Sequence, residues 1–269
     1  QAVDIWSNHA KSFGLGQFMG YDLPTGKRGS IPDSKTYKRV YPNGGWRSTT
    51  IVSNSIGQGE ILMTPIQLAN MMATIANEGY YYTPHIIKRI EGHKIDKKFT
   101  TKHVTTIDKK YFKPIISGLF DVYNLGTARS LRVEGIDICG KTGTSENFAK
   151  IGGKKVQLKD HSIFVAFAPK DNPKIAIAVM VENGGYGATI AGPIASLMIE
   201  KYLRQKITRI DLEKRILATS LQSEYAIFGG LSETVKLQMR ISDSLLKKKT
   251  FIPTVKVKID STKENKKAI

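Results

Sequence analysis

The sequence predicts an α+β fold in which helices pack on an antiparallel β-sheet. Three segments rich in apolar and β-branched residues are expected to be strands: 131–144, 162–168 and 175–181. Turn residues such as Gly152-Gly153 separate them, and such short links favour antiparallel pairing. A helix is expected at 191–203, directly after the last strand, because apolar residues recur there at helical spacing.

The part of the chain before these strands predicts further elements. Residues 1–13 carry apolar side chains at helical spacing and are expected to form the end of a helix. Residues 21–46 are rich in Gly, Pro, Asp and Asn, which predicts a long loop. Residues 80–90 are expected to form a short strand, and residues 110–124 a helix.

The clearest helix signal lies between these segments. Thr64 is a good N-cap residue, Pro65 suits the first helical position, and Gly79 is expected to end the helix. Just upstream, residues 56–60 read Ile-Gly-Gln-Gly-Glu. We interpret them as a glycine turn that leads into the helix, with a role in lining a substrate cleft as the alternative.

Length and charge limit the possible classes of protein. The chain has 269 residues and a formal net charge of +18, so its surface attracts anions. Residues 201–269 alone hold 16 Lys and Arg against 7 Asp and Glu. We therefore expect a folded portion over 1–205 and a basic C-terminal tail over 206–269 that is partly helical or disordered. The longest apolar run, Ile175–Val181, is far shorter than the about 20 residues of a membrane-spanning helix.

The titratable residues give no metal-binding pattern. A single cysteine, Cys139, excludes an internal disulfide, and its apolar neighbours predict a buried core residue. His161 begins a predicted strand and is expected to form a structural hydrogen bond. The histidines have no ligand spacing, so we expect neither a metal nor a cofactor; they are His9, His85, His93, His103 and His161.

One short motif carries chemical information. Residues 139–146 read Cys-Gly-Lys-Thr-Gly-Thr-Ser-Glu, and the Lys-Thr-Gly triplet ends a predicted strand that two more strands and a helix follow. Side chains alternate along a strand, so the hydroxyl groups of Thr142 and Thr144 are expected on one face. The loop Glu182–Gly187 lacks the Gly-x-Gly-x-x-Gly pattern of a phosphate loop, and we interpret it as a plain connection.

Several stretches, in this order along residues 10–203, together resemble one known family. They are SFGLG (12–16), SNSIGQGEILMTPIQLANMMATIANEGYYYTPHI (53–86), GTA (126–128), GKTGTSE (140–146) and HSIFVAFAP (161–169). The sequence resembles the transpeptidase domain of penicillin-binding proteins, in particular the class B enzymes of the penicillin-binding protein 2 type. The resemblance implies the serine β-lactamase and transpeptidase fold.

The resemblance also implies roles for the motif residues. The hydroxyls of Thr142 and Thr144 are expected to bind the terminal carboxylate of a D-Ala-D-Ala stem peptide or of a β-lactam. Lys141 is expected to supply a positive charge beside that carboxylate and the reacting serine. Gly143 leaves room for the close approach of substrate, and the Thr144 backbone N–H is one expected donor of the oxyanion hole. The edge of this strand suits pairing with an extended peptide.

Two other motifs of the family, Ser-x-x-Lys and Ser-x-Asn, belong upstream of the Lys-Thr-Gly strand. Only residues 244–247 match the first, and they lie after that strand, within the basic tail. Residues 145–147 match the second but adjoin the strand itself. We therefore expect the nucleophilic serine outside this chain, which we interpret as the C-terminal part of a longer protein and as inactive alone.

The expected activity of that longer protein is peptidoglycan D,D-transpeptidation in cell-wall synthesis and cell-shape maintenance. Expected partners are stem peptides, β-lactams and a membrane-anchored cell-wall synthesis complex, with no nucleic acid. The expected location is the periplasmic face of the inner membrane, with an anchor N-terminal to this chain. Two alternatives stay open: a β-lactamase or β-lactam sensor, and a non-enzymatic module that binds anions through its charge.

Overall fold

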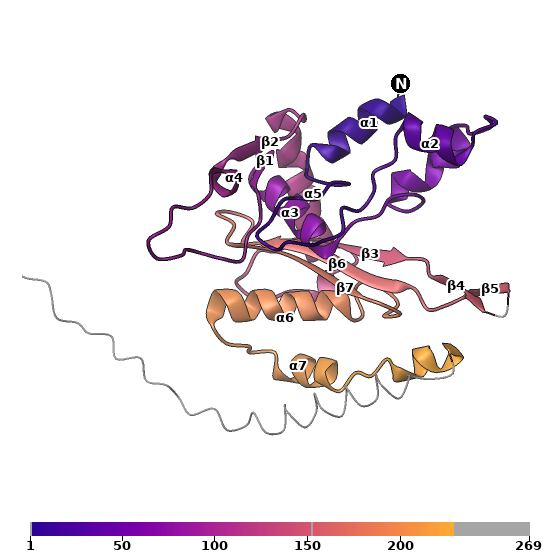
Figure 1. Ribbon diagram of the computed structural model, residues 1–269. Helices are drawn as coiled ribbons and strands as arrows, with labels where there is room; N and C mark the ends of the chain where they lie inside the picture. Colours follow the sequence, from indigo (N-terminus) through magenta and orange to yellow (C-terminus); the bar gives the residue numbers. More distant parts are fainter. Residues whose placement is uncertain (1, 152, 229–269) are drawn as a thin grey trace, which may run out of the picture. The chain divides into compact units, whose positions relative to one another are not determined.

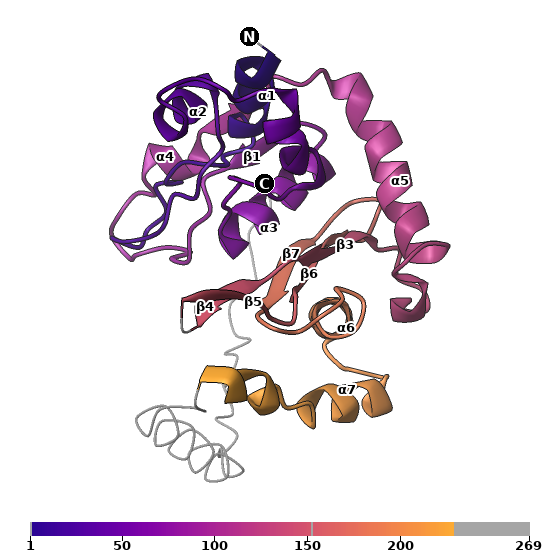
Figure 2. The ribbon, with the colours of Figure 1, turned by 90° about the vertical axis from the view of Figure 1, so that its right-hand side faces the viewer.

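The computed structural model describes residues 2–151 and 153–228. Residues 1–221 form one compact unit, and a second unit begins at residue 222. Figures 1 and 2 show the arrangement of the elements. The α-helices are α1 (Ala2–Lys11), α2 (Ser34–Val40), α3 (Pro65–Ala76), α4 (Lys97–Thr100), α5 (Phe112–Asn124), α6 (Ala191–Arg204) and α7 (Ile210–Leu217). The 3₁₀ helices are η1 (Ser48–Ile56), η2 (Lys109–Tyr111), η3 (Arg129–Leu131) and η4 (Gln222–Phe228).

The central sheet has three antiparallel strands in the order β3-β6-β7, which confirms the predicted pairing. Its strands are β3 (Cys139–Ser145), β6 (His161–Ala168) and β7 (Ile175–Val181). The first strand is shorter than predicted. Leu131 instead ends η3, and Val133 bridges to Ile136 across a tight turn, because Gly135 adopts a φ of +68° that reverses the chain.

Two small sheets accompany the central one. Strands β1 (Tyr80–Tyr82) and β2 (Lys102–Val104) pair antiparallel, so the strand expected over 80–90 covers only its first three residues. Strands β4 (Phe148–Ile151) and β5 (Lys154–Gln157) form a hairpin that the sequence analysis did not predict. In Figure 1 this hairpin extends the β3–β6 ribbon beyond the sheet.

The helix predicted after Thr64 is confirmed as α3. The Thr64 hydroxyl accepts a hydrogen bond from the Gln67 amide, and the Gln67 side chain accepts one from the Thr64 amide, which completes a capping box. The prediction of an unbroken loop over 21–46 was wrong, because α2 lies within it. Asp33 starts that helix, since its carboxylate accepts hydrogen bonds from the amide and hydroxyl of Thr36.

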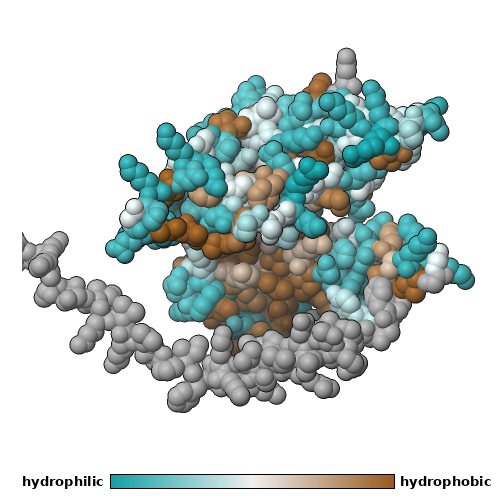
Figure 3. Space-filling view, viewed as in Figure 1, coloured by the Kyte–Doolittle hydropathy of each residue, from teal (hydrophilic) through white to brown (hydrophobic). Residues whose placement is uncertain are grey.

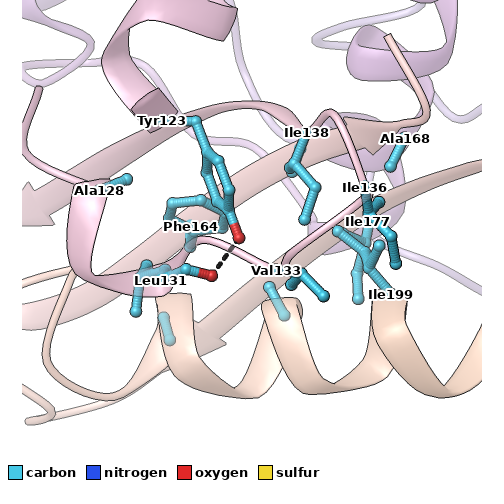
Figure 4. Close-up of a cluster of buried hydrophobic side chains, with 13 residues drawn as sticks. Tyr123, Ala128, Leu131, Val133, Ile136, Ile138, Phe164, Ala168, Ile177 and Ile199 are labelled. Atoms are coloured by element: carbon cyan, nitrogen blue, oxygen red, sulfur yellow. Dashed lines mark hydrogen bonds between the residues drawn. The ribbon is translucent and has the colours of Figure 1, made fainter. Parts of the chain in front are cut away.

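Helices cover both faces of the central sheet. Helix α6 packs on one face, and α3 and α5 pack on the other (Figures 1 and 2). The α6 face holds a buried cluster shown in Figure 4, in which the Tyr123 hydroxyl donates to the Leu131 carbonyl. The buried residues of the α3/α5 face are Leu68, Met72, Cys139, Val165 and Phe167.

Helix α6 uses two sides. Ala195 and Ile199 are buried against the sheet, whereas Met198 and Tyr202 are about half exposed. Met198 and Tyr202 line an apolar groove of about 510 Å³ between α6 and α7. In the space-filling view of Figure 3, apolar side chains gather on the surface at the level of α6. Within the described residues, no helix has the length and apolar character needed to cross a membrane.

A buried carboxylate joins α6 to the segment before α7. Glu200 is fully buried and accepts hydrogen bonds from the Thr208 amide and hydroxyl and from Arg209 Nε at 2.9 Å. Burial opposes ionisation of Glu200, but these hydrogen bonds outweigh it and hold its pKa below the usual value. Helix α7 thus lies in the first compact unit, and the expected boundary at residue 205 stays a prediction. The Ser-x-x-Lys match at 244–247 lies outside the described residues.

Candidate functional site

The predicted site residues lie together in β3, directly after its buried first two residues. Cys139 and Gly140 are buried, whereas Lys141 is exposed and Thr142, Gly143 and Thr144 are partly exposed. Within residues 2–151 and 153–228, β3 is an edge strand, because it pairs with β6 on one side and with no strand on the other. In that part of the chain, the outer edge of the motif strand is therefore not covered by another strand.

The register of the sheet places the motif side chains on two faces. Thr142 and Thr144 pair with Phe164 and Ser162 of β6 and lie on the α6 face, as alternation predicts. Lys141 pairs with Val165 and lies on the α3/α5 face. The Lys141 ammonium group is exposed and donates to the Thr142 carbonyl at 2.8 Å. The strand thus separates the positive charge from the hydroxyls while keeping them adjacent in sequence.

Thr142 contacts a residue to which the sequence analysis gave no role. Its Oγ1 lies 3.0 Å from Oγ1 of Thr127, which follows α5. Thr127 is the middle residue of the GTA stretch, so that stretch was the available signal. Because the two threonines share one hydrogen bond, Thr127 orients the Thr142 hydroxyl.

Thr144 is held from another direction by the segment before α3. Gln58 Nε2 approaches the Thr144 carbonyl at 3.4 Å, which places the Gly-Gln-Gly-Glu segment beside the motif. The same segment is anchored at Glu60, whose carboxylate accepts from the buried Tyr37 hydroxyl at 2.8 Å. Burial and the neighbouring Glu60 raise the pKa of Tyr37 to about 12. The contact favours the alternative interpretation, in which this segment borders the site.

The loop after β7 packs directly on the backbone of the motif strand. A Cβ atom added at Gly187 would lie 2.6 Å from the Gly143 carbonyl oxygen and 2.3 Å from that of Ile163. Only glycine fits such an approach without moving the strands. The interpretation of Glu182–Gly187 as a plain connection therefore missed a structural role.

The buried hydroxyl of Ser162, which pairs with Thr144 in the sheet, holds this loop in place. Ser162 donates to the Tyr186 carbonyl at 2.9 Å and accepts from the Ala191 amide at 3.1 Å, at the start of α6. Next to it, His161 Nδ1 accepts from the Asn183 amide at 3.2 Å, as expected of a structural histidine. The sequence offered no signal for the role of Ser162, because both partners are distant along the chain.

In the described residues, neither the Cys139 thiol nor a group of metal-binding side chains forms a second site. Cys139 is fully buried, as predicted, and burial raises the pKa of its thiol to about 12. Across the described part of the chain, no three His, Cys, Asp or Glu side chains come close enough to hold a metal ion.

Comparison with known proteins agrees with this geometry. The family model "Penicillin binding protein transpeptidase domain" matches residues 3–200. A peptidoglycan D,D-transpeptidase MrdA of Haemophilus influenzae is 30% identical over 78% of this chain and 34% of its own length. The MrdA protein of Acinetobacter baumannii is 34% identical over 70% of this chain and 30% of its own length. The chain thus spans about one third of the length of the curated relatives it matches.

Solved structures agree as well. Penicillin-binding protein 2 of Pseudomonas aeruginosa, solved with WCK 5153, matches with a TM-score of 0.63 and 29% identity over 77% of this chain and 44% of that one. Penicillin-binding protein 2 of Helicobacter pylori, solved in complex with MreC, matches with a TM-score of 0.60 and 28% identity over 75% of this chain and 36% of that one. The predicted resemblance and fold are therefore confirmed, and the chain belongs to the penicillin-binding protein transpeptidase family, with relatives among the class B enzymes.

Proposed function

We propose that this chain forms part of a serine D,D-transpeptidase that cross-links peptidoglycan and maintains cell shape. The single observation that carries the proposal is the placement of Lys-Thr-Gly-Thr on the accessible outer half of an edge strand. An edge strand can pair with an extended peptide, and the hydroxyls of Thr142 and Thr144 can bind its terminal carboxylate.

In this proposal the serine nucleophile comes from residues N-terminal to this chain. Its hydroxyl attacks the carbonyl carbon between the two D-alanines, the C–N bond breaks, and D-alanine leaves with the serine proton. The Thr144 amide stabilises the oxyanion, and the Lys141 charge favours the bound carboxylate. An amine of a second stem peptide then attacks the acyl-enzyme, which forms the cross-link and frees the serine.

The proposal extends to partners and location. Stem peptides and β-lactams would bind at β3, and the longer protein would belong to a membrane-anchored cell-wall synthesis complex on the periplasmic face of the inner membrane. The support is family membership, together with the relative from Helicobacter pylori that was solved with MreC. No nucleic acid is needed for this activity, and we propose neither a metal nor a cofactor.

The test uses fluorescent penicillin and intact-mass measurement. The full-length protein should gain one covalent penicillin, whereas the chain of 269 residues alone should gain none. A stoichiometric adduct on Ser244 of the isolated chain would contradict the proposal. Transfer of the acyl group from a D-Ala-D-Ala peptide to an added amine distinguishes a transpeptidase from a β-lactamase, which gives only the hydrolysed product.

A further inference from the structure

The β4–β5 hairpin continues the strand that carries the candidate site. The paired residues Ser145 and His161 end the central ladder, the Leu158 amide donates to the Asn147 carbonyl at 2.9 Å, and the hairpin pairing begins with Phe148 opposite Gln157. Since β5 lies on the β6 side of this ribbon, the outer edge of β3 leads into the outer edge of β4. An extended chain that follows the first edge therefore reaches the second.

The hairpin has an exposed basic face, which we define as the side chains of Phe148, Lys150, Lys155 and Gln157. These four residues are exposed, whereas on the other face Ala149, Ile151 and Val156 are partly buried and only Lys154 is exposed. The Lys155 ammonium group lies 3.8 Å from the centre of the Phe148 ring, so an aromatic ring and a cation are already paired on this face.

Lys150 and Lys155 stand directly opposite each other in the hairpin. Like charges in opposite positions of an antiparallel pair destabilise it, and their Cβ atoms are about 5 Å apart. Residues 148–157 contain no acidic residue, and in the described structure neither lysine forms an ion pair. A bound anion between the two ammonium groups would remove this repulsion.

The distance from the site identifies the anion. Lys150 lies six residues beyond Thr144, or about 20 Å along extended strands. A lysine side chain covers roughly 6 Å of this distance. A peptide antiparallel to β3, with its terminal carboxylate at Thr142 and Thr144, would bring the residue about four positions before its C-terminus within reach of both lysines.

We propose that the basic hairpin face binds a second carboxylate of the peptide substrate, located N-terminal to the D-Ala-D-Ala end. This proposal rests on the proposed function. It favours a peptide over a phosphate-bearing polymer or a lipid surface, because only a chain bound along β3 is led to the hairpin by the continuous edge.

The experiment compares two peptides as competitors of fluorescent penicillin on the full-length protein. The first is acetyl-Glu-Ala-Ala-D-Ala-D-Ala, and the second carries Gln in place of Glu. The wild-type protein should bind the Glu peptide more tightly, by roughly up to five-fold for each lysine contacted. Added salt should reduce this preference. The preference is a ratio, so a general loss of acylation does not alter it.

Variants assign the effect to the hairpin. Lys150→Gln with Lys155→Gln should abolish the preference, whereas Lys150→Arg with Lys155→Arg should keep it. A matched control removes two exposed charges elsewhere, Lys88→Gln with Lys94→Gln in the loop between β1 and α4, and should keep the preference. Circular dichroism melts of all variants check that the hairpin changes leave the fold intact.

The outcomes separate this proposal from the proposed function. Penicillin labelling with equal competition by the two peptides would overturn the proposal while supporting the function. Absence of labelling would overturn the function, and direct binding of dansyl-labelled versions of both peptides then decides the hairpin proposal. If the Gln variants keep the peptide preference but lose binding to phosphatidylglycerol vesicles, the hairpin contacts a lipid surface and the proposal is wrong.

Discussion

The two faces of the central sheet differ in how completely they are closed. Among the described residues, the cluster on the α6 face contains thirteen buried residues, against five on the α3/α5 face. The α3/α5 face relies more on partly buried side chains, among them Met63 and Met71, which can adapt their shape. The comparison indicates that the α6 face is the rigid support of the site, and the other face the adjustable one.

Two buried phenylalanines on opposite faces of the same strand, β6, test this difference most strongly. Phe164 lies on the α6 face beside Gly140 and Gly192, and Phe167 lies on the α3/α5 face; both are fully buried. Phe164→Ala should lower the free energy of unfolding by about 5 kcal/mol and Phe167→Ala by about 3 kcal/mol, because the adaptable face collapses better around the cavity. Urea denaturation measures both, and the reverse order would break the comparison.

The next effect concerns the carboxylate that closes the α6 face. Glu200→Gln keeps the size of the side chain but leaves Arg209 without its charged partner. Removal of one member of a buried ion pair should cost about 3 kcal/mol in unfolding free energy. The control Asp211→Asn, an exposed change on α7, should stay within about 0.5 kcal/mol. Equal effects of the two changes would mean that the buried network does not support the α6 face.

The candidate site residues extend the comparison of the two sheet faces, because Thr144 lies on the α6 face and Lys141 on the α3/α5 face. Thr144→Val in the full-length protein keeps the shape of the residue but removes the hydroxyl that we propose binds the substrate carboxylate, and a hydrogen bond to a charged group is worth about 1.5–3 kcal/mol. Acylation by penicillin should slow about 10- to 150-fold while the melting temperature barely changes. Lys141→Ala, on the opposite face, should slow it more because a full charge is lost. An unchanged rate in Thr144→Val would remove β3 from the carboxylate site.

The smallest expected effect concerns Asp33, the N-cap residue of α2, which belongs to neither face of the central sheet. Hydrogen bonds from Thr36 and the nearby Lys11 ammonium group, 3.1 Å away, lower the pKa of Asp33 from 3.8 to about 2. A lowered pKa in the folded state stabilises the protein above the unfolded pKa, and this stabilisation is lost as the pH falls toward 2. Asp33→Asn should therefore be less stable than wild type by about 0.5–1 kcal/mol above pH 4. Denaturation at several pH values should show that the difference shrinks as the pH falls from 4 and disappears below pH 2.

Local signals explain which elements the sequence predicts correctly. Helix α3 has an N-cap, a first-turn proline and a terminating glycine within one short stretch, and the strands β6 and β7 are apolar runs bounded by turn residues. The hairpin β4–β5 has no such pattern, because six of its ten residues are Lys, Gly or Gln. Helix α2 was missed because its start signal, Asp33, lies among Pro and Gly residues that also predict loops.

In the candidate site, too, features with a local sequence signal were predicted and features without one were not. The motif Lys141–Thr144 and the shared face of its threonines follow from sequence and strand alternation. The contacts of Thr127, Ser162 and Gly187 bring together residues that are 15 to 44 positions apart from their partners in the strand or loop. No local pattern encodes such contacts, since they exist only once the sheet has formed.

Cys139 makes the opening of the site strand directly measurable. It is the only cysteine in the sequence, it begins β3, and its burial and raised pKa keep the thiol unreactive in the folded protein. A thiol reagent such as a maleimide can therefore react only when β3 leaves its place between β6 and the helices. The labelling rate of the 269-residue chain thus reports the free energy of that local opening.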